Sequence, residues 1–174
     1  MNKIIGIVFL TAVFCLTAIP GFAENPAAGM RQAVKELQHL TELLKDGQKG
    51  YQMSASDVQS GDLKRLFREY SVQRARFLND LRKEVTRLGG DPDKGGSAKG
   101  ALHRGWIKAR TAISKNNDKA VVDEVLRGEG AALKGYQEAL SKDLSDETRK
   151  LVEKQRKDIQ AAYDRFKSID LEQR

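Results

Sequence analysis

The chain has 174 residues, of which 32% are charged, and a formal net charge of +7. Its single cysteine, Cys15, lies in an N-terminal apolar segment that we expect to be removed. The mature chain therefore excludes disulfides, thiolate metal sites and thiol catalysis. Aromatic residues make up only 6% of the chain and do not alternate with basic clusters, which argues against nucleic-acid binding.

The N-terminus has the pattern of a secretory signal peptide. Lys3 supplies a short positive region, residues 4–19 form a mostly apolar run, and small residues lead up to Ala23. The apolar run is too short for a comfortable membrane span. We therefore predict a signal peptide over 1–23 with cleavage after Ala23, a single domain over 24–174, and a periplasmic or secreted protein without a transmembrane segment.

The first two predicted helices follow the signal peptide. The spacing of apolar residues predicts a helix from Ala27 or Met30 to Ala55, and a second from Asp62, which can cap it, to Leu88. The inner stripe of the first helix is Val34, Leu37, Thr41, Leu44, Gln48 and Tyr51. The inner stripe of the second is Leu63, Leu66, Tyr70, Gln73, Phe77, Leu81, Val85 and Leu88. Two glycines, Asp91 and Pro92 then stop the second helix.

The stretch from Asp93 to Asp118 is too long for a tight turn and contains a predicted short helix of its own, capped by Ser97. A linker of this kind can cross the length of a bundle, so we expect a crossover between the second and third long helices.

Two further long helices complete the predicted fold. The third spans Asp118 to Leu140, and the fourth begins after the cap residue Ser145. Their inner stripes are Val122, Val125, Glu129, Ala132, Tyr136 and Leu140, and Val152, Gln155, Ile159, Ala162, Tyr163, Phe166 and Ile169. The sequence therefore predicts an all-α four-helix bundle with a short extra helix in the crossover.

Each of the four stripes has a polar residue where the pattern calls for an apolar one: Gln48, Gln73, Glu129 and Tyr163. A bundle would bring them to a similar depth, where a di-metal protein uses a Glu from each of two helices and a Glu-x-x-His from each of the others. Here only Glu129 is a strong ligand, because amides are neutral and a phenol has a pKa of about 10. We therefore expect no catalytic residue, no cofactor and no tight metal pair. If iron or another divalent metal binds, Glu129 would hold it with Gln48, Gln73 and Tyr163.

The alternative is a hydrogen-bonded network around the Glu129 carboxylate, since a lone buried carboxylate carries a large desolvation penalty. Gln48, Gln73 and Tyr163 can donate hydrogen bonds, and Arg74 can supply a full positive charge. We favour this buried polar network over a metal site, and expect it to fix the helix register.

Five glycines lie beside these residues, at Gly47, Gly50, Gly128, Gly130 and Gly135. Each costs about 1 kcal/mol relative to Ala inside a helix. They indicate either a packing solution, which we favour, or a close helix approach or bulge at a functional site.

Several segments of the chain resemble a bacterial family of ferritin-like four-helix-bundle proteins that is classed as a domain of unknown function. The segments are 46–51, 66–77, 100–106, 127–136 and 160–165, and together they cover most of the mature chain. In that family the positions of Gln48 and Gln73 tend to be Glu, and the position of Tyr163 tends to be His. This sequence keeps only Glu129, so the resemblance implies the fold but does not carry over metal binding.

These features predict an exported, non-catalytic bundle that acts by binding or scaffolding in the envelope or under stress. The alternative is a ferritin-like metal-binding protein or degenerate oxidase centred on Glu129. The expected partner is another protein or a second copy of the chain. The positive charge also permits weak contact with anionic lipid or polymer.

Overall fold

The computed structural model describes residues 26–94 and 117–172, and all regular secondary structure in these ranges is helical. The helices are α1 (Pro26–Asp57), α2 (Gly61–Arg87), α4 (Asp118–Leu140) and α5 (Asp146–Glu172). The predicted all-helical, four-helix fold class is confirmed. The predicted signal peptide and the short helix after Ser97 lie outside the described residues. None of the helices in the described ranges is long and apolar enough to cross a membrane.

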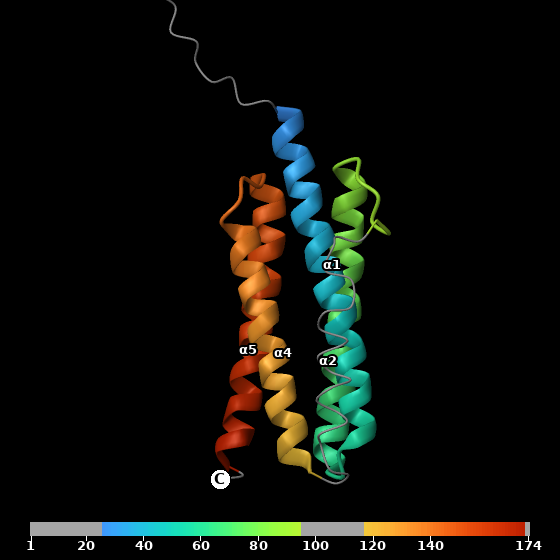
Figure 1. Ribbon diagram of the computed structural model, residues 1–174, viewed down its shortest axis with the longest axis vertical. Coiled ribbons are helices and arrows are strands. Elements are labelled where there is room, and N and C mark those ends of the chain that lie inside the picture. Colours follow the sequence, from blue (N-terminus) through green and yellow to red (C-terminus); the bar gives the residue numbers. More distant parts are fainter. Residues whose placement is uncertain (1–25, 95–116, 173–174) are drawn as a thin grey trace, which may run out of the picture.

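Contacts at the two ends of the bundle establish the direction of each helix. Asp118, at the start of α4, accepts hydrogen bonds of 2.7 and 2.9 Å from the backbone N–H groups of Gln59 and Ser60, beside the start of α2. At the other end, the Thr148 hydroxyl near the start of α5 donates to Glu84 near the end of α2. Helices α2 and α4 therefore run parallel, and the end of α2 and the start of α4 lie at opposite ends of the bundle (Figure 1).

Helices α1 and α2 form one antiparallel hairpin, and α4 and α5 form the other (Figure 1). The hairpins join mainly through α1 and α4, while α2 and α5 touch at only a few points. The order around the bundle is therefore α2, α1, α4, α5. Arg74 and Glu129, which prove central below, come from the diagonal pair α2 and α4.

Short polar side chains cap three of the helices. Ser60 caps α2 by accepting a hydrogen bond from the Leu63 N–H at 3.3 Å, so the predicted cap at Asp62 is wrong. Asp62 lies in the first turn instead, where its negative charge is favourable next to the free N–H groups. Asn117 caps α4, and the Ser145 hydroxyl accepts from the Thr148 N–H at the start of α5, as predicted.

Two glycines end α2. Gly89 has a φ of 76°, in the left-handed region that favours glycine, and the Gly90 N–H donates to the Val85 carbonyl at 2.9 Å. A Cβ at Gly90 would lie 2.5 Å from Val34 Cγ1 on α1 and 3.0 Å from Val85 Cγ1. The glycine pair thus both stops the helix and lets the turn pack directly against α1.

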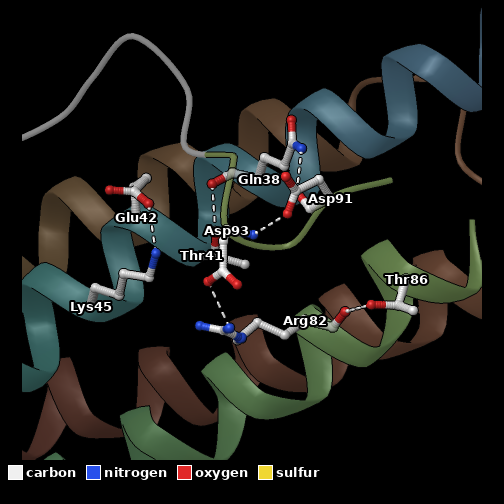
Figure 2. Close-up of polar contacts among 8 residues, drawn as sticks. All are labelled: Gln38, Thr41, Glu42, Lys45, Arg82, Thr86, Asp91 and Asp93. Atoms are coloured by element: carbon white, nitrogen blue, oxygen red, sulfur yellow. Dashed lines mark hydrogen bonds and ion pairs between the residues drawn. The ribbon is translucent and has the colours of Figure 1, made fainter. Parts of the chain in front are cut away.

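Side-chain hydrogen bonds hold this turn against both helices of the hairpin (Figure 2). The Gln38 amide on α1 donates to the Asp91 carbonyl at 2.7 Å, and Arg82 on α2 forms a 2.7 Å ion pair with Asp93. The Asp91 carboxylate in turn accepts from the Asp93 N–H at 2.9 Å. The path of the chain as it leaves α2 is therefore determined by α1 as well as by α2.

The core consists of two apolar clusters separated along the bundle axis. The upper cluster contains Ala33, Leu37, Leu40, Leu44, Phe77, Leu81, Val85, Tyr136, Ala139, Leu144, Val152 and Ile159. The lower cluster contains Tyr51, Ala55, Val58, Leu63, Phe67, Val121, Val122, Val125 and Phe166. A layer of buried polar side chains lies between them.

The predicted inner stripe of α2 is correct at its ends and wrong in the middle. Phe67, Ser71 and Arg74 are buried, whereas the predicted Leu66, Tyr70 and Gln73 are only partly buried. Both stripes have helical spacing, so the sequence pattern alone does not separate them. The Phe67 and Tyr70 rings both lie 5.3 Å from the Phe166 ring of α5, but only Phe67 is fully buried.

We predict that Gly90→Ala lowers the free energy of unfolding by about 1 to 3 kcal/mol, the usual range for overpacking. The stiff side chain of Val34 cannot move away from the added methyl group without shifting α1. Urea denaturation followed by circular dichroism measures the change.

The matched control is Gly61→Ala, because a Cβ there meets only the exposed Arg65 guanidinium at 3.8 Å. Equal stability losses for the two variants would contradict the packing role of Gly90.

Candidate functional site

An ion pair between Arg74 of α2 and Glu129 of α4 lies at the centre of the bundle. The Arg74 Nη2 atom is 2.5 Å from Glu129 Oε2, and the two residues are only 1% and 4% exposed. Burial disfavours the charged guanidinium, but Glu129 and the neighbouring tyrosines together outweigh this effect and raise the pKa of Arg74. The positive charge of Arg74 is therefore retained in the core, next to the carboxylate that stabilises it.

Tyr51 of α1 supplies a second hydrogen-bond donor to the Glu129 carboxylate. Its hydroxyl donates a 2.6 Å hydrogen bond to Glu129 Oε1, so each carboxylate oxygen has a protein donor. Burial, followed by the charge of Glu129, raises the pKa of the Tyr51 phenol well above its ordinary value. The phenol thus stays protonated and keeps its role as a donor.

Arg74 also contacts a side chain of its own helix and two aromatic rings. Its Nη1 atom donates to the Gln73 side-chain oxygen at 2.5 Å. The guanidinium carbon lies 5.6 Å from the centre of the Tyr51 ring and 5.7 Å from that of Phe77, within cation–π range. We call Tyr51, Gln73, Arg74 and Glu129 the central polar layer.

The structure brings together three of the five residues that the sequence analysis grouped, namely Gln73, Arg74 and Glu129. Within the described residues, neither Tyr163 nor the side chain of Gln48 hydrogen-bonds to Glu129. Both side chains are half-buried, and the Gln48 backbone carbonyl accepts from the Ser71 hydroxyl at 3.4 Å.

The phenol beside Glu129 is Tyr51, which the sequence analysis placed in the inner stripe of α1 without giving it a polar role. Tyr51 follows Gln48 by three residues, so both could face the core. Of these two residues, the longer side chain with an apolar ring reaches the layer and also packs against Phe67, Tyr70 and Phe166.

A second buried polar contact lies above the central polar layer. The Tyr136 hydroxyl donates to the Gln155 side-chain oxygen at 2.7 Å, and the Gln155 amide donates to the Phe77 carbonyl at 3.1 Å. Burial raises the pKa of the Tyr136 phenol. This contact joins α2, α4 and α5 and leaves these side chains with partners inside the protein.

A pocket between α1 and α4 reaches the central polar layer from the surface; we call it the α1–α4 pocket. Its walls and floor are formed by Leu43, Leu44, Asp46, Gly47, Gly50, Tyr51, Arg74, Glu124, Val125, Arg127, Gly128, Glu129 and Ala132. Three of the glycines noted in the sequence, at positions 47, 50 and 128, belong to it. The glycines therefore lie where a side chain would narrow the approach to Glu129.

The glycines of the two helices differ in what they do. A Cβ at Gly135 would collide with Leu43 Cδ1, so this glycine leaves room for the Leu43 side chain. A Cβ at Gly128 or Gly130 would have no neighbour within 4 Å, and one at Gly47 would touch only Arg74 at 4.0 Å. Packing therefore explains Gly135 but not Gly47, Gly128 or Gly130.

The donor set of the central polar layer does not fit a metal ion. Glu129 is its only carboxylate, and both of its oxygens already accept hydrogen bonds from protein donors. The Arg74 guanidinium beside it would repel a cation. Over the described ranges, no group of three or more His, Cys, Asp or Glu side chains lies close enough to hold a metal.

A protein-family model, described as a domain of unknown function (DUF2383), matches residues 32–142. The chain belongs to this family. No curated protein matches it. The matched residues include the whole central polar layer and nearly all of α1, together with α2 and α4. Helix α5 lies beyond the matched stretch, yet it contributes Gln155, Ile159 and Phe166 to the core.

We predict that Arg74→Met or Glu129→Leu alone destabilises the protein by about 3 to 5 kcal/mol, because each leaves a buried charge without its partner. The double variant should recover most of this loss, since apolar side chains of similar volume can replace a buried ion pair. Denaturant unfolding of all four proteins gives the coupling energy.

Additive losses in the double variant would contradict the pairing of Arg74 with Glu129.

We predict that Tyr51→Phe lowers stability at neutral pH by about 1 to 3 kcal/mol, because Glu129 loses a donor. The raised pKa of Tyr51 also predicts a pH dependence. The unfolded phenol loses its proton near pH ~10 while the folded one keeps it, so this contribution is complete at lower pH and declines as the pH rises above that value. Unfolding free energies from pH ~8 to pH ~11 should fall less steeply in the variant.

Tyr70→Phe is the control. Tyr70 stacks on Tyr51 at 5.6 Å but makes no hydrogen bond to Glu129 in the described structure. A loss at neutral pH as large as that of Tyr51→Phe would show that the hydroxyl of Tyr51 has no special role.

Proposed function

We propose that this protein is an exported, non-catalytic four-helix bundle that acts by binding or scaffolding in the cell envelope. The observation that carries the proposal is the Arg74–Glu129 ion pair. It neutralises the one carboxylate of the central polar layer with a guanidinium from the facing helix. A layer filled in this way supports a structural and binding role rather than redox chemistry.

A ferritin-like arrangement is part of the proposal. Ferritin-like bundles have two antiparallel helix pairs with one long crossover between the second and third helices. The parallel course of α2 and α4 and the separation of their joined ends support this topology. Export is supported by the charged and apolar pattern of residues 1–23, and a stress-associated role in the envelope is an extension of it.

The competing function is a metal-binding protein or oxidase centred on Glu129. It would require Arg74 and Tyr51 to leave the carboxylate, because their hydrogen bonds occupy both oxygens. It would also require additional hard ligands, while the amides of Gln48 and Gln73 and the phenol of Tyr163 are weak ones. The side chains present therefore favour binding without a metal.

The test is to express the full chain in a bacterium and purify it from the envelope fraction without chelator. We expect the protein to begin after Ala23 and to contain well below one equivalent of iron, manganese or zinc per chain. Ferrous iron and oxygen should produce no absorbance change beyond that of a buffer control. Mass spectrometry, elemental analysis and absorbance spectroscopy provide these readouts.

The Arg74→Met/Glu129→Leu double variant is the control, because it removes the carboxylate without leaving an unpaired buried charge. Near-stoichiometric metal in the natural protein that is lost in this variant would overturn the proposal. Recovery of the protein from the cytoplasm with residues 1–23 intact would overturn the export part of it.

A further inference from the structure

The α1–α4 pocket connects the surface with three charged or polar side chains that are almost completely buried. Tyr51, Arg74 and Glu129 form its inner end, and each is at most 4% exposed. Apolar side chains on both helices, including Leu44 and Val125, form its walls. A mostly apolar pocket with a few convergent polar groups is the usual form of a small-molecule site.

The glycines indicate that the space is not an accident of packing. Alanine at Gly128 would meet no atom within 4 Å, and alanine at Gly47 would make only an ordinary contact with Arg74. Each glycine costs about 1 kcal/mol relative to alanine in a helix. At these two positions, which line the pocket, the chain gives up helix stability without gaining a close packing contact.

The inner end of the pocket has both donor and acceptor capacity beyond the hydrogen bonds that Arg74 and Glu129 make with the described residues. A guanidinium has five N–H groups, and those of Arg74 have two protein acceptors among the described residues, Gln73 and Glu129. The Glu129 carboxylate offers about four acceptor positions, of which Arg74 and Tyr51 use one each. A group that both accepts from Arg74 and donates to Glu129 would satisfy both.

The charges around the pocket select an uncharged occupant. Arg74 and Glu129 neutralise each other at the inner end, and Glu124 and Arg127 form an ion pair among the lining residues. Asp46, the fifth charged residue of the lining, also has an interaction within the protein. A charged ligand would leave a net charge in a region with little access to water, which is unfavourable.

We propose that the α1–α4 pocket binds a small uncharged molecule with an apolar body and one hydroxyl group. The apolar body lies against the walls formed by Leu44 and Val125. The hydroxyl oxygen accepts a hydrogen bond from Arg74, and the hydroxyl O–H donates a hydrogen bond to Glu129. This inference rests on the proposed binding function, because a metal at Glu129 would take the same carboxylate.

The experiment measures binding of two probes of similar shape to the purified full chain, benzyl alcohol and toluene, by ligand-observed NMR titration. Benzyl alcohol should bind about tenfold more tightly, the effect expected for a hydrogen bond to a charged group. Gly128→Leu should weaken benzyl alcohol binding by about tenfold or more, because its side chain fills the pocket.

Gly130→Leu is the matched control. It lies two residues away on the same helix, also has no neighbour within 4 Å, and does not line the pocket. Its affinity should stay within about twofold of the natural protein's, the scatter expected for a surface change. In the Arg74→Met/Glu129→Leu variant, the preference for the alcohol over toluene should disappear.

Absence of binding, equal affinity for the two probes, or equal effects of the two leucine variants would overturn the pocket proposal. The metal analysis separates this failure from that of the proposed function. If the protein is free of metal and binds neither probe, only the pocket proposal is wrong. If the protein holds metal at Glu129, the proposed function is wrong as well.

Discussion

The buried ion pair between Arg74 and Glu129 is the constraint on which the rest of the bundle depends. The two residues come from diagonal helices, α2 and α4, and their nitrogen and oxygen atoms are 2.5 Å apart. Because neither charge is stable in the core alone, the pair specifies the depth at which α2 and α4 face each other. Tyr51 from α1 adds a third helix to the same contact. The apolar clusters above and below could tolerate a small slide of the helices, but this layer could not.

The same layer also decides what chemistry the bundle can support. Di-metal bundles place several carboxylates at this depth, and the cations offset their charge. In this chain a guanidinium from the protein itself offsets the single carboxylate, so the position is filled from within. Tyr51, Arg74 and Glu129 of this layer also line the α1–α4 pocket.

The glycines link this core to the surface of the protein. Gly135 and Gly90 allow close contact between elements, since an added Cβ would collide with Leu43 or Val34. Gly47 and Gly128 have no such neighbours and leave the pocket open. One residue type therefore serves two opposite purposes in the same bundle, and only the distance to the nearest side chain distinguishes them.

The sequence by itself determined the number, type and approximate bounds of the four long helices, because a 3.6-residue apolar period and capping residues are local signals. It also grouped Arg74 with Gln48, Gln73 and Tyr163 as candidate donors to Glu129, since a buried carboxylate requires a donor. The tertiary structure alone decided which face of α2 is inside, because the stripes through Tyr70 and through Phe67 have equivalent spacing and only the packing of the other helices buries Phe67 more completely than Tyr70. It likewise decided that Tyr51, rather than Tyr163 or Gln48, completes the layer. Side-chain reach across helices is a long-range property that periodicity within one helix does not contain.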